Sequence, residues 1–112
     1  MKTAVLYQRV SSEEQMSGKS IEVQKELCAK WARENGYQVV GNYEDGGKTG
    51  TKMVGRDGLD DMIIHCQKEK IDVALVIDTD RIARNEFDHY YIRNELKKHG
   101  TQLIAINQPM ID

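Results

Sequence analysis

Two hydrophobic periods alternate along the chain. Short runs of consecutive apolar residues, typical of buried strands, separate longer segments in which apolar residues recur every three or four positions, as in amphipathic helices. The segment 71–77 is almost continuously apolar, which is typical of a strand covered on both faces. In 57–66 the apolar spacing is instead helical, with Asp57 in the position of an N-cap, while Gly36 and Gly100 mark the ends of two other helices. The predicted elements are, in order, a strand at 3–9, a helix at 20–35, a strand at 37–43, a helix at 57–66, a strand at 71–77, a helix at 82–99 and a strand at 101–106.

This alternation of strands and helices indicates an α/β fold. Strands separated by helices of about three or four turns are joined by right-handed crossovers, which place the strands parallel in one sheet. We therefore expect a mainly parallel sheet of four or five strands, flanked by helices. The 112 residues are enough for one compact core and contain no repeat or low-complexity tract, so we expect a single domain over 1–112.

Composition narrows the class of protein further. Hydrophobic residues make up 39% of the chain and charged residues 30%, with a single proline, which excludes collagen-like and disordered chains. The longest apolar run is far shorter than the roughly 18 residues that a membrane-spanning helix needs, and the N-terminus does not resemble a signal peptide. We expect a soluble, cytoplasmic domain with no membrane partner. Because the net charge is −2, any contact with DNA must be local or supplied by another part of the protein.

Three polar segments follow predicted strands, at 11–19, 44–56 and 78–84. The carboxyl ends of parallel strands meet at one edge of a sheet, so these segments should converge there, where open α/β folds bind their ligands. One segment contains Gly-Lys-Thr at 47–49, as a phosphate-binding P-loop does. However, Asn42 stands where that motif requires its first glycine, and no helix pattern begins at this threonine. A glycine-rich loop able to close over a ligand is the better interpretation.

The cysteines, the histidines and a group of aromatic residues are expected to have structural rather than catalytic roles. Cys28 and Cys66 are too few for a zinc site or a disulfide framework and are expected to be buried thiols. Three histidines scattered over the predicted helices are expected to be solvated: His65, His89 and His99. Three aromatic residues of the third predicted helix are expected in the core or in an interface with another subunit: Phe87, Tyr90 and Tyr91.

Two of the polar segments carry a specific pattern. Tyr-Gln-Arg-Val-Ser stands at 7–11 and Asp-Arg-Ile-Ala-Arg at 80–84, and together they resemble the signature of the serine recombinases, the resolvase/invertase family. Ser-Ile-Glu-Val-Gln at 20–24 and Gly-Arg-Asp-Gly-Leu at 55–59 are similar to two further elements of that family. The resemblance covers nearly the whole chain in order. The length of chain between Ser11 and Gln24 is similar to that of the large serine recombinases, which include phage integrases and transposases.

The resemblance implies a site-specific recombinase that cleaves DNA without a metal ion. Ser11 would attack the DNA backbone and form a 5′-phosphoserine link, with Ser12 as the alternative nucleophile. Asp80 would either orient the neighbouring arginines or exchange a proton with the serine or the leaving hydroxyl. The partners implied are recombination-site DNA and further copies of the protein, as a homodimer that assembles to a tetramer. The catalytic residues implied are Ser11, Arg9, Arg56, Asp80, Arg81, Arg84 and Gln24.

Physical chemistry supports an arginine-based site beside the resemblance. Attack on a phosphodiester builds negative charge on the non-bridging and leaving oxygens, which metal ions often stabilise. The candidate segments hold no cluster of acids or histidines at metal-ligand spacing, so no metal or other cofactor is expected. Arginine is always charged and matches phosphate oxygens with paired hydrogen bonds, so a cluster of arginines can stabilise the same charge.

Each interpretation has a plainer alternative. Ser11 could be a turn serine whose hydroxyl bonds the backbone, and the arginines could form surface ion pairs, which contribute little to stability. Tyr7 fits a packing residue with a useful hydroxyl. The rival function is a non-catalytic α/β signalling or nucleotide-binding module that uses the same sheet edge. A signalling module would need acids at the strand ends, where this sequence has arginines.

Overall fold

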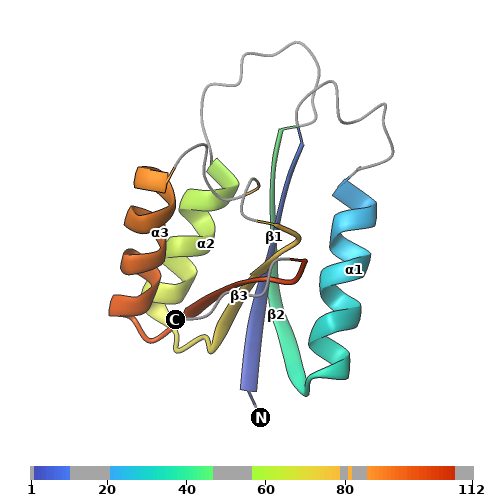
Figure 1. Ribbon diagram of the computed structural model, residues 1–112. Coiled ribbons are helices and arrows are strands. Elements are labelled where there is room, and N and C mark those ends of the chain that lie inside the picture. Colours follow the sequence, from blue (N-terminus) through green and yellow to red (C-terminus); the bar gives the residue numbers. More distant parts are fainter. Residues whose placement is uncertain (1, 11–20, 47–56, 79–80, 82–85, 108–112) are drawn as a thin grey trace.

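The computed structural model describes residues 2–10, 21–46, 57–78, 81 and 86–107. These residues form a sheet with α1 on one face and α2 and α3 on the other (Figure 1). The elements in chain order are β1 (Lys2–Val10), α1 (Ile21–Glu34), β2 (Tyr37–Gly46), α2 (Asp57–Lys68), β3 (Val73–Val76), α3 (Glu86–Lys98) and β4 (Gln102–Ala105). The predicted α/β class is confirmed, with four strands in the sheet of the described residues.

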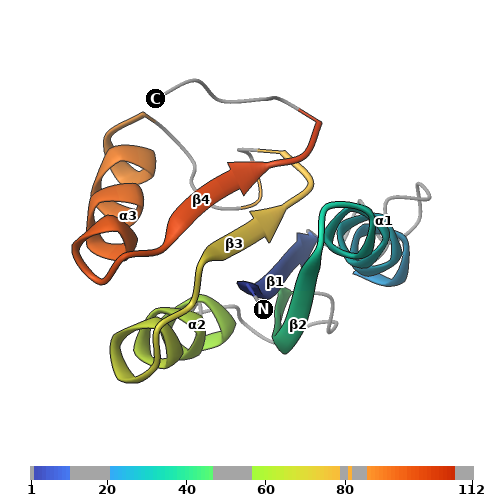
Figure 2. The ribbon, with the colours of Figure 1, turned by 90° about the horizontal axis from the view of Figure 1, so that it is seen from below.

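The strands lie in the order β2-β1-β3-β4, and each neighbouring pair is parallel. Figure 2 shows this order from below the sheet, with α1 over the β1–β2 side and α2 and α3 on the opposite face. The two central strands, β1 and β3, are covered on both faces. All four residues of β3 are buried, as the continuous apolar run predicts.

Two apolar layers hold the helices to the sheet. The larger layer lies between the sheet and the helices α2 and α3, and it includes Val5, Met62 and Leu96. The smaller layer lies under α1 and includes Leu6 and Cys28. Alternate residues of β1 thus point to opposite layers, which is what strand geometry requires. No helix in the described part of the chain is long and apolar enough to cross a membrane.

Strand β2 is longer than predicted and contains a bulge. It continues to Gly46 because it pairs with β1 along the whole of that strand. Ala4 pairs with Val39 but the next residue, Val5, pairs with Gly41, so one residue of β2 is extra at this point. Side chains alternate between faces along a strand, so the extra residue reverses the face that each later residue of β2 occupies.

The ends of α1 and α3 are set by a glycine next to the helix, whereas the start of α2 is set by a contact with another element. Gly36 after α1 and Gly100 after α3 have positive φ angles of 82° and 85°, as their predicted role at helix ends requires. The prediction of Asp57 as the N-cap of α2 is wrong. Asp57 is the first residue of the helix, and the backbone N–H groups of Gly58 and Leu59 donate instead to a carboxylate in β2, described below.

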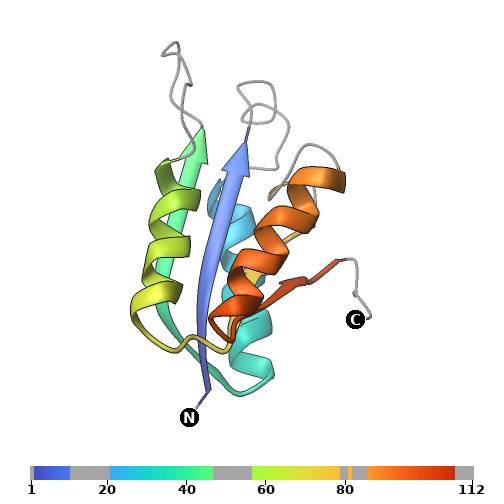
Figure 3. The ribbon, with the colours of Figure 1, turned by 90° about the vertical axis from the view of Figure 1, so that its left-hand side faces the viewer.

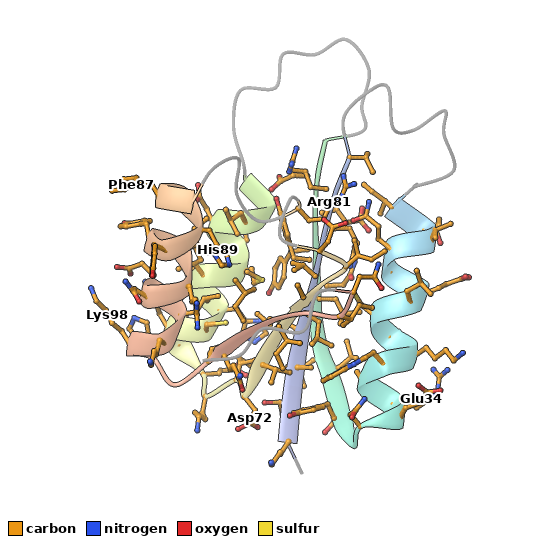
Figure 4. The ribbon with its side chains drawn as sticks, in the orientation of Figure 1. Glu34, Asp72, Arg81, Phe87, His89 and Lys98 are labelled. Atoms are coloured by element: carbon orange, nitrogen blue, oxygen red, sulfur yellow. The ribbon has the colours of Figure 1, made fainter. Side chains whose placement is uncertain are left out.

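The aromatic residues of α3 do not enter the core. Phe87 is 78% exposed, Tyr90 62% and Tyr91 61%, so of the two predicted locations the core is excluded. Figure 4 shows Phe87 on the side of α3 that faces away from the sheet. Their spacing places the three rings on neighbouring positions of one helix face.

The prediction that all three histidines are solvated is wrong for two of them. His65 lies between α2 and β2, where its Nδ1 is 2.7 Å from the hydroxyl of Tyr43. His89 is half-buried on α3, and burial and the nearby Arg93 lower its pKa. Only His99 is exposed as expected.

Candidate active site

The carboxyl ends of β1 and β2 lie together at the top of Figure 1, and β3, which is parallel to β1, ends lower because it pairs with β1 only from Ala4 to Leu6. β1 ends at Val10, β2 at Gly46 and β3 at Val76, and the three polar segments of the sequence lie at or directly after these ends. Helix α1 begins at the same edge with Ile21. The predicted convergence of polar segments at the carboxyl edge therefore agrees with the strand ends that the structure describes.

Gln24 ties the first helix to the end of β1. β3 pairs with β1 only from Ala4 to Leu6, so the backbone of Arg9 lies beyond that ladder. The side-chain oxygen of Gln24 accepts a hydrogen bond from the Arg9 N–H (3.2 Å), and its nitrogen donates to the Arg9 carbonyl (3.1 Å). Gln24 is 1% exposed. Its amide thus does for Arg9 what a neighbouring strand would do, and it fixes the backbone two residues before Ser11.

Arg9 and Arg81 are joined by reciprocal hydrogen bonds. Nη1 of Arg81 donates to the carbonyl of Arg9 (2.9 Å), and Nε of Arg9 donates to the carbonyl of Arg81 (3.2 Å). These bonds connect the turn after β3 to the end of β1. The arrangement places two guanidinium groups together at the carboxyl edge of the sheet, and Figure 4 shows Arg81 there.

Arg81 is buried with a carboxylate beside it. The side chain is 3% exposed, and its Nε lies 3.7 Å from the carboxylate of Asp78, an ion-pair distance rather than a hydrogen bond. The backbone N–H of Arg81 also donates to the carbonyl of Asp78 (3.1 Å), which closes the turn. The opposite charge offsets part of the cost of burying a guanidinium. A positive charge fixed in this buried position is well suited to stabilise a developing anion.

The structure brings three of the predicted site residues together and leaves four untested. Arg9, Gln24 and Arg81 form one hydrogen-bonded group at the carboxyl edge. The other four predicted residues lie outside the described residues: Ser11, Arg56, Asp80 and Arg84. The alternative nucleophile, Ser12, also lies outside them.

Asp45 is a residue of this edge that the sequence did not single out. Its carboxylate accepts hydrogen bonds from the hydroxyl of Tyr7 and from the backbone N–H groups of Gly58 and Leu59. Tyr7 is fully buried with a bonded hydroxyl, which agrees with its predicted packing role. The available signal was an acid just beyond the predicted strand 37–43, at the edge where ligand sites form. The pattern of the sequence could not show that two of its partners lie in helix α2.

Another series of hydrogen-bonded polar side chains joins β1 to β2. Gln8 is fully buried, and its side-chain nitrogen donates to Oδ1 of Asn42 (2.8 Å), whose nitrogen donates to Glu44 (3.2 Å). A carboxylate can only accept, so these orientations are fixed from Glu44 inward, and the oxygen of Gln8 is left as a buried acceptor without a partner. These hydrogen bonds help to hold β1 and β2 together next to Arg9.

The two thiols are poor candidates for a nucleophile. Burial raises the pKa of Cys28 to about 12 and also raises the pKa of Cys66, against a smaller lowering by a hydrogen bond with Thr101. Both thiols therefore stay protonated near neutral pH, and the thiolate is the reactive form. Among the described residues, no three His, Cys, Asp or Glu side chains are grouped so that they could hold a metal ion.

Comparison with known proteins gives one consistent result. A family model described as "Resolvase, N terminal domain" matches residues 4–112. A protein of Bacillus subtilis (strain 168) named "Putative DNA recombinase" is 35% identical over 103 residues, which are 91% of this chain and 20% of that protein. The chain thus spans one fifth of the length of this relative.

Solved structures with the same fold extend this result. The structure of a resolvase family site-specific recombinase from Streptococcus pneumoniae has a TM-score of 0.87 at 32% identity, over 98% of this chain and 75% of that chain. The N-terminal catalytic domain of TP901-1 integrase has a TM-score of 0.82 at 29% identity, over 97% of this chain and 80% of that chain. The rival interpretation as a signalling or nucleotide-binding module is not favoured by these similarities.

Proposed function

Because this chain belongs to the resolvase family of serine recombinases, we propose that it is a site-specific recombinase catalytic domain that cleaves DNA with Ser11. We propose that residues 1–112 act as one domain. The relative is about five times longer than the matched region, and one similar structure is an integrase, which supports a large serine recombinase.

The proposed reaction is a transesterification at a DNA phosphodiester. The hydroxyl oxygen of Ser11 attacks the phosphorus, a bond forms between them, and the bond from phosphorus to the 3′ oxygen breaks. The 3′ oxygen takes up a proton and leaves as a free hydroxyl, while the 5′ phosphate stays on the serine. In the reverse direction the 3′ hydroxyl of the exchanged strand attacks the phosphoserine and releases Ser11. The ester keeps the bond energy, so the religation step needs no nucleotide.

The observation that carries this proposal is the pair of arginines at the end of β1. Arg9, which is two residues before Ser11 in the chain, and Arg81 hold each other by reciprocal hydrogen bonds. Their guanidinium groups would stabilise the negative charge of the pentacoordinate transition state, the contribution that is usually largest in such sites. We assign the same role to Arg56 and Arg84, and to Asp80 either the orientation of these arginines or the exchange of a proton with the serine or the leaving hydroxyl.

Gln24 has a different role in this proposal. Both polar atoms of its side chain are bonded to the backbone of Arg9. It therefore acts through Arg9 as a positioning residue rather than by touching the DNA. This refines its assignment as a member of the catalytic group.

The proposed partners are DNA at the recombination sites and further copies of the protein. Self-association to dimers and tetramers is supported by the exposed aromatic rings of α3, since exposed apolar patches commonly mark protein interfaces. A stable interface buries roughly 800 Å² per partner, more than the exposed patches of about 300–600 Å² found on typical monomers, so assembly would need DNA or other parts of the protein as well. With DNA as the proposed substrate, the reaction would take place in the cytoplasm.

The test is capture of the covalent intermediate. Full-length protein is incubated with DNA that carries its recombination site, the reaction is stopped with detergent, and protein attached to the 5′ end is measured. Wild type is compared with Ser11→Ala and Ser12→Ala in the presence of a metal chelator. We expect the adduct in wild type and Ser12→Ala and none in Ser11→Ala. Loss in Ser12→Ala alone would move the nucleophile by one residue, and no adduct in any variant on bound DNA would overturn the enzymatic proposal.

A further inference from the structure

Helix α1 carries a row of apolar side chains that the sheet covers only in part. Val23, Leu27 and Trp31 are four residues apart, so they lie in one row along the helix. Val23 is 41% exposed and Leu27 is 42% exposed, although both are apolar. The ring of Trp31 stacks on the ring of Tyr37, the first residue of β2, with centroids 5.8 Å apart. The row therefore lies on the flank of α1 that faces β2.

Strand β2 continues this apolar surface. It is the outer strand in the order β2-β1-β3-β4, so among the described residues no strand lies beyond it. Val39 is 40% exposed, and it lies on the α1 face of the sheet because its partner Ala4 belongs to the layer under α1. The extra residue at this point disturbs the spacing of the outer backbone groups, and such bulges protect an edge strand from pairing with another strand. A partner would therefore pack on the side chains of α1 rather than extend the sheet.

The row on α1 is symmetric about Leu27. Val23 lies about one turn before it and Trp31 about one turn after it. If two copies of α1 pack antiparallel about a two-fold axis at Leu27, each Leu27 meets its own copy, and Val23 of one copy meets Trp31 of the other. This reciprocity is what a two-fold interface between identical chains requires.

The charges beside the row follow the same symmetry. Glu26 and Lys30 are both exposed, and their spacing places them in one row next to the apolar one. Glu26 lies before Leu27 in the chain and Lys30 after it, so the antiparallel arrangement brings Glu26 of each copy beside Lys30 of the other. The flank of α1 is thus acidic in one half and basic in the other, and it complements its own reversed copy in charge as well as in shape.

We propose that α1 is a surface at which two copies of this chain associate, antiparallel about a two-fold axis near Leu27. This surface is separate from the exposed rings of α3, because the two helices lie on opposite faces of the sheet. Figure 3 shows α2 and α3 in front of the sheet and α1 behind it. The inference goes beyond the proposed function and does not depend on it, since neither the arginines nor DNA takes part. A contact centred on one helix from each copy is small, so we expect monomer and dimer to exchange reversibly.

The first test uses the position on the two-fold axis. Leu27→Cys would place two thiols opposite each other, so mild oxidation should join two copies by a disulfide. Full-length protein without DNA is oxidised, and the covalent dimer is measured on a non-reducing gel. Lys25→Cys is the matched control, because this residue is exposed on the other side of the same helix. We expect Leu27→Cys to form the dimer at least about tenfold faster, since only its thiols are held together in the associated state. Cys28 and Cys66 are buried, so wild type should form none.

The second test uses the charges, with the same cross-link as the measurement. In the Leu27→Cys background, Glu26→Lys places like charges opposite each other at both ends of the contact, and so does Lys30→Glu. Each change alone should slow cross-linking by about tenfold or more. An equal mixture of the two variants restores opposite charges between unlike copies and should recover the rate. Because each helix in the mixture keeps its own like charges, recovery cannot come from pairing within one helix.

The outcomes decide the inference independently of DNA cleavage. All variants are compared at a temperature at which each is folded by circular dichroism. No dimer in Leu27→Cys, as expected if another part of the protein covers α1, or equal rates in Leu27→Cys and Lys25→Cys, would overturn the inference. So would a mixture that cross-links no faster than its two components. Whether the Ser11 adduct forms on DNA is measured separately, so failure of one proposal leaves the other standing.

Discussion

The two edges of the sheet are built from different chemistry. At the amino edge, short connections are closed by backbone groups and small side chains: Thr3 and Asp72 bond each other through both backbone and side chain, and Thr101 Oγ1 donates to the carbonyl of Ile71 (2.8 Å). At the carboxyl edge, the backbone of Arg9 is held instead by a buried amide and a buried guanidinium. Figure 4 shows Asp72 and Arg81 at these opposite ends.

The difference separates groups that hold the fold from groups that prepare a site. The amino edge satisfies its backbone with few desolvated charges, which is the less costly solution. The carboxyl edge buries Gln24 and Arg81, whose long polar side chains cost more to desolvate and to order. A protein under selection for stability alone would have little reason to keep them there. Substitutions at the two edges should therefore differ in how stability and activity change together.

The largest expected effect is that of Arg81→Lys. Lysine keeps the positive charge but cannot reproduce the planar group that donates to the Arg9 carbonyl beside Asp78. We expect the rate of covalent adduct formation to fall by about 100-fold or more. Arg33→Lys on the exposed part of α1 is the control and should leave the rate unchanged. A wild-type rate in Arg81→Lys would show that charge alone is sufficient at this edge.

Gln24→Met should lower both stability and activity. Methionine has a similar length but cannot bond the Arg9 N–H, and leaving such a group unpaired costs about 1–3 kcal/mol of unfolding free energy. Because the end of β1 is then less fixed, we expect adduct formation per folded molecule to fall by about tenfold. Urea unfolding gives the first quantity and single-turnover cleavage the second. A loss of stability with an unchanged rate would make Gln24 a structural residue only.

Thr101→Val is the counterpart at the amino edge. Valine has the same shape as threonine but leaves the carbonyl of Ile71 without the hydroxyl that now donates to it. We expect about 1–3 kcal/mol lower unfolding free energy and no change in the cleavage rate of folded protein. If this variant also cleaved slowly, the two edges would not be separable in the way proposed.

The smallest effect should come from His89, half-buried on α3. Burial, together with Arg93, lowers its pKa in the folded state below the value of about 6.5 in unfolded chains. The unfolded state therefore binds a proton more readily, so this contribution to stability is complete above about pH 6.5 and is lost as the pH falls. In His89→Gln the melting temperature should decrease less between pH 7.5 and 5.5 than in wild type. Equal decreases would place the pH dependence on other groups.

The sequence predicted the fold more completely than the site. The seven elements follow from apolar periods that are local, such as the continuous run that became β3. The bond from Gln24 to Arg9 could not be predicted from periodicity, since a glutamine in an early helical turn has no distinguishing pattern. The same is true of Asp45, whose partners in α2 are 13 and 14 residues away. The assignment of Ser11 and Arg56 depends on the family resemblance and stays a prediction.

The extra residue in β2 determines which face of the sheet each later residue of that strand occupies. Before the shift, Val39 pairs with Ala4, which lies in the layer under α1; after it, Tyr43 pairs with Tyr7, which lies in the layer under α2. Deleting Val40 would join Val39 directly to Gly41, which already pairs with Val5, so Asp45 would still pair with Arg9 and keep its side of the sheet. A single-codon deletion at this position should therefore straighten the strand and leave the contacts of Asp45 with α2 in place, whereas an inserted residue beyond it would turn Asp45 to the opposite face.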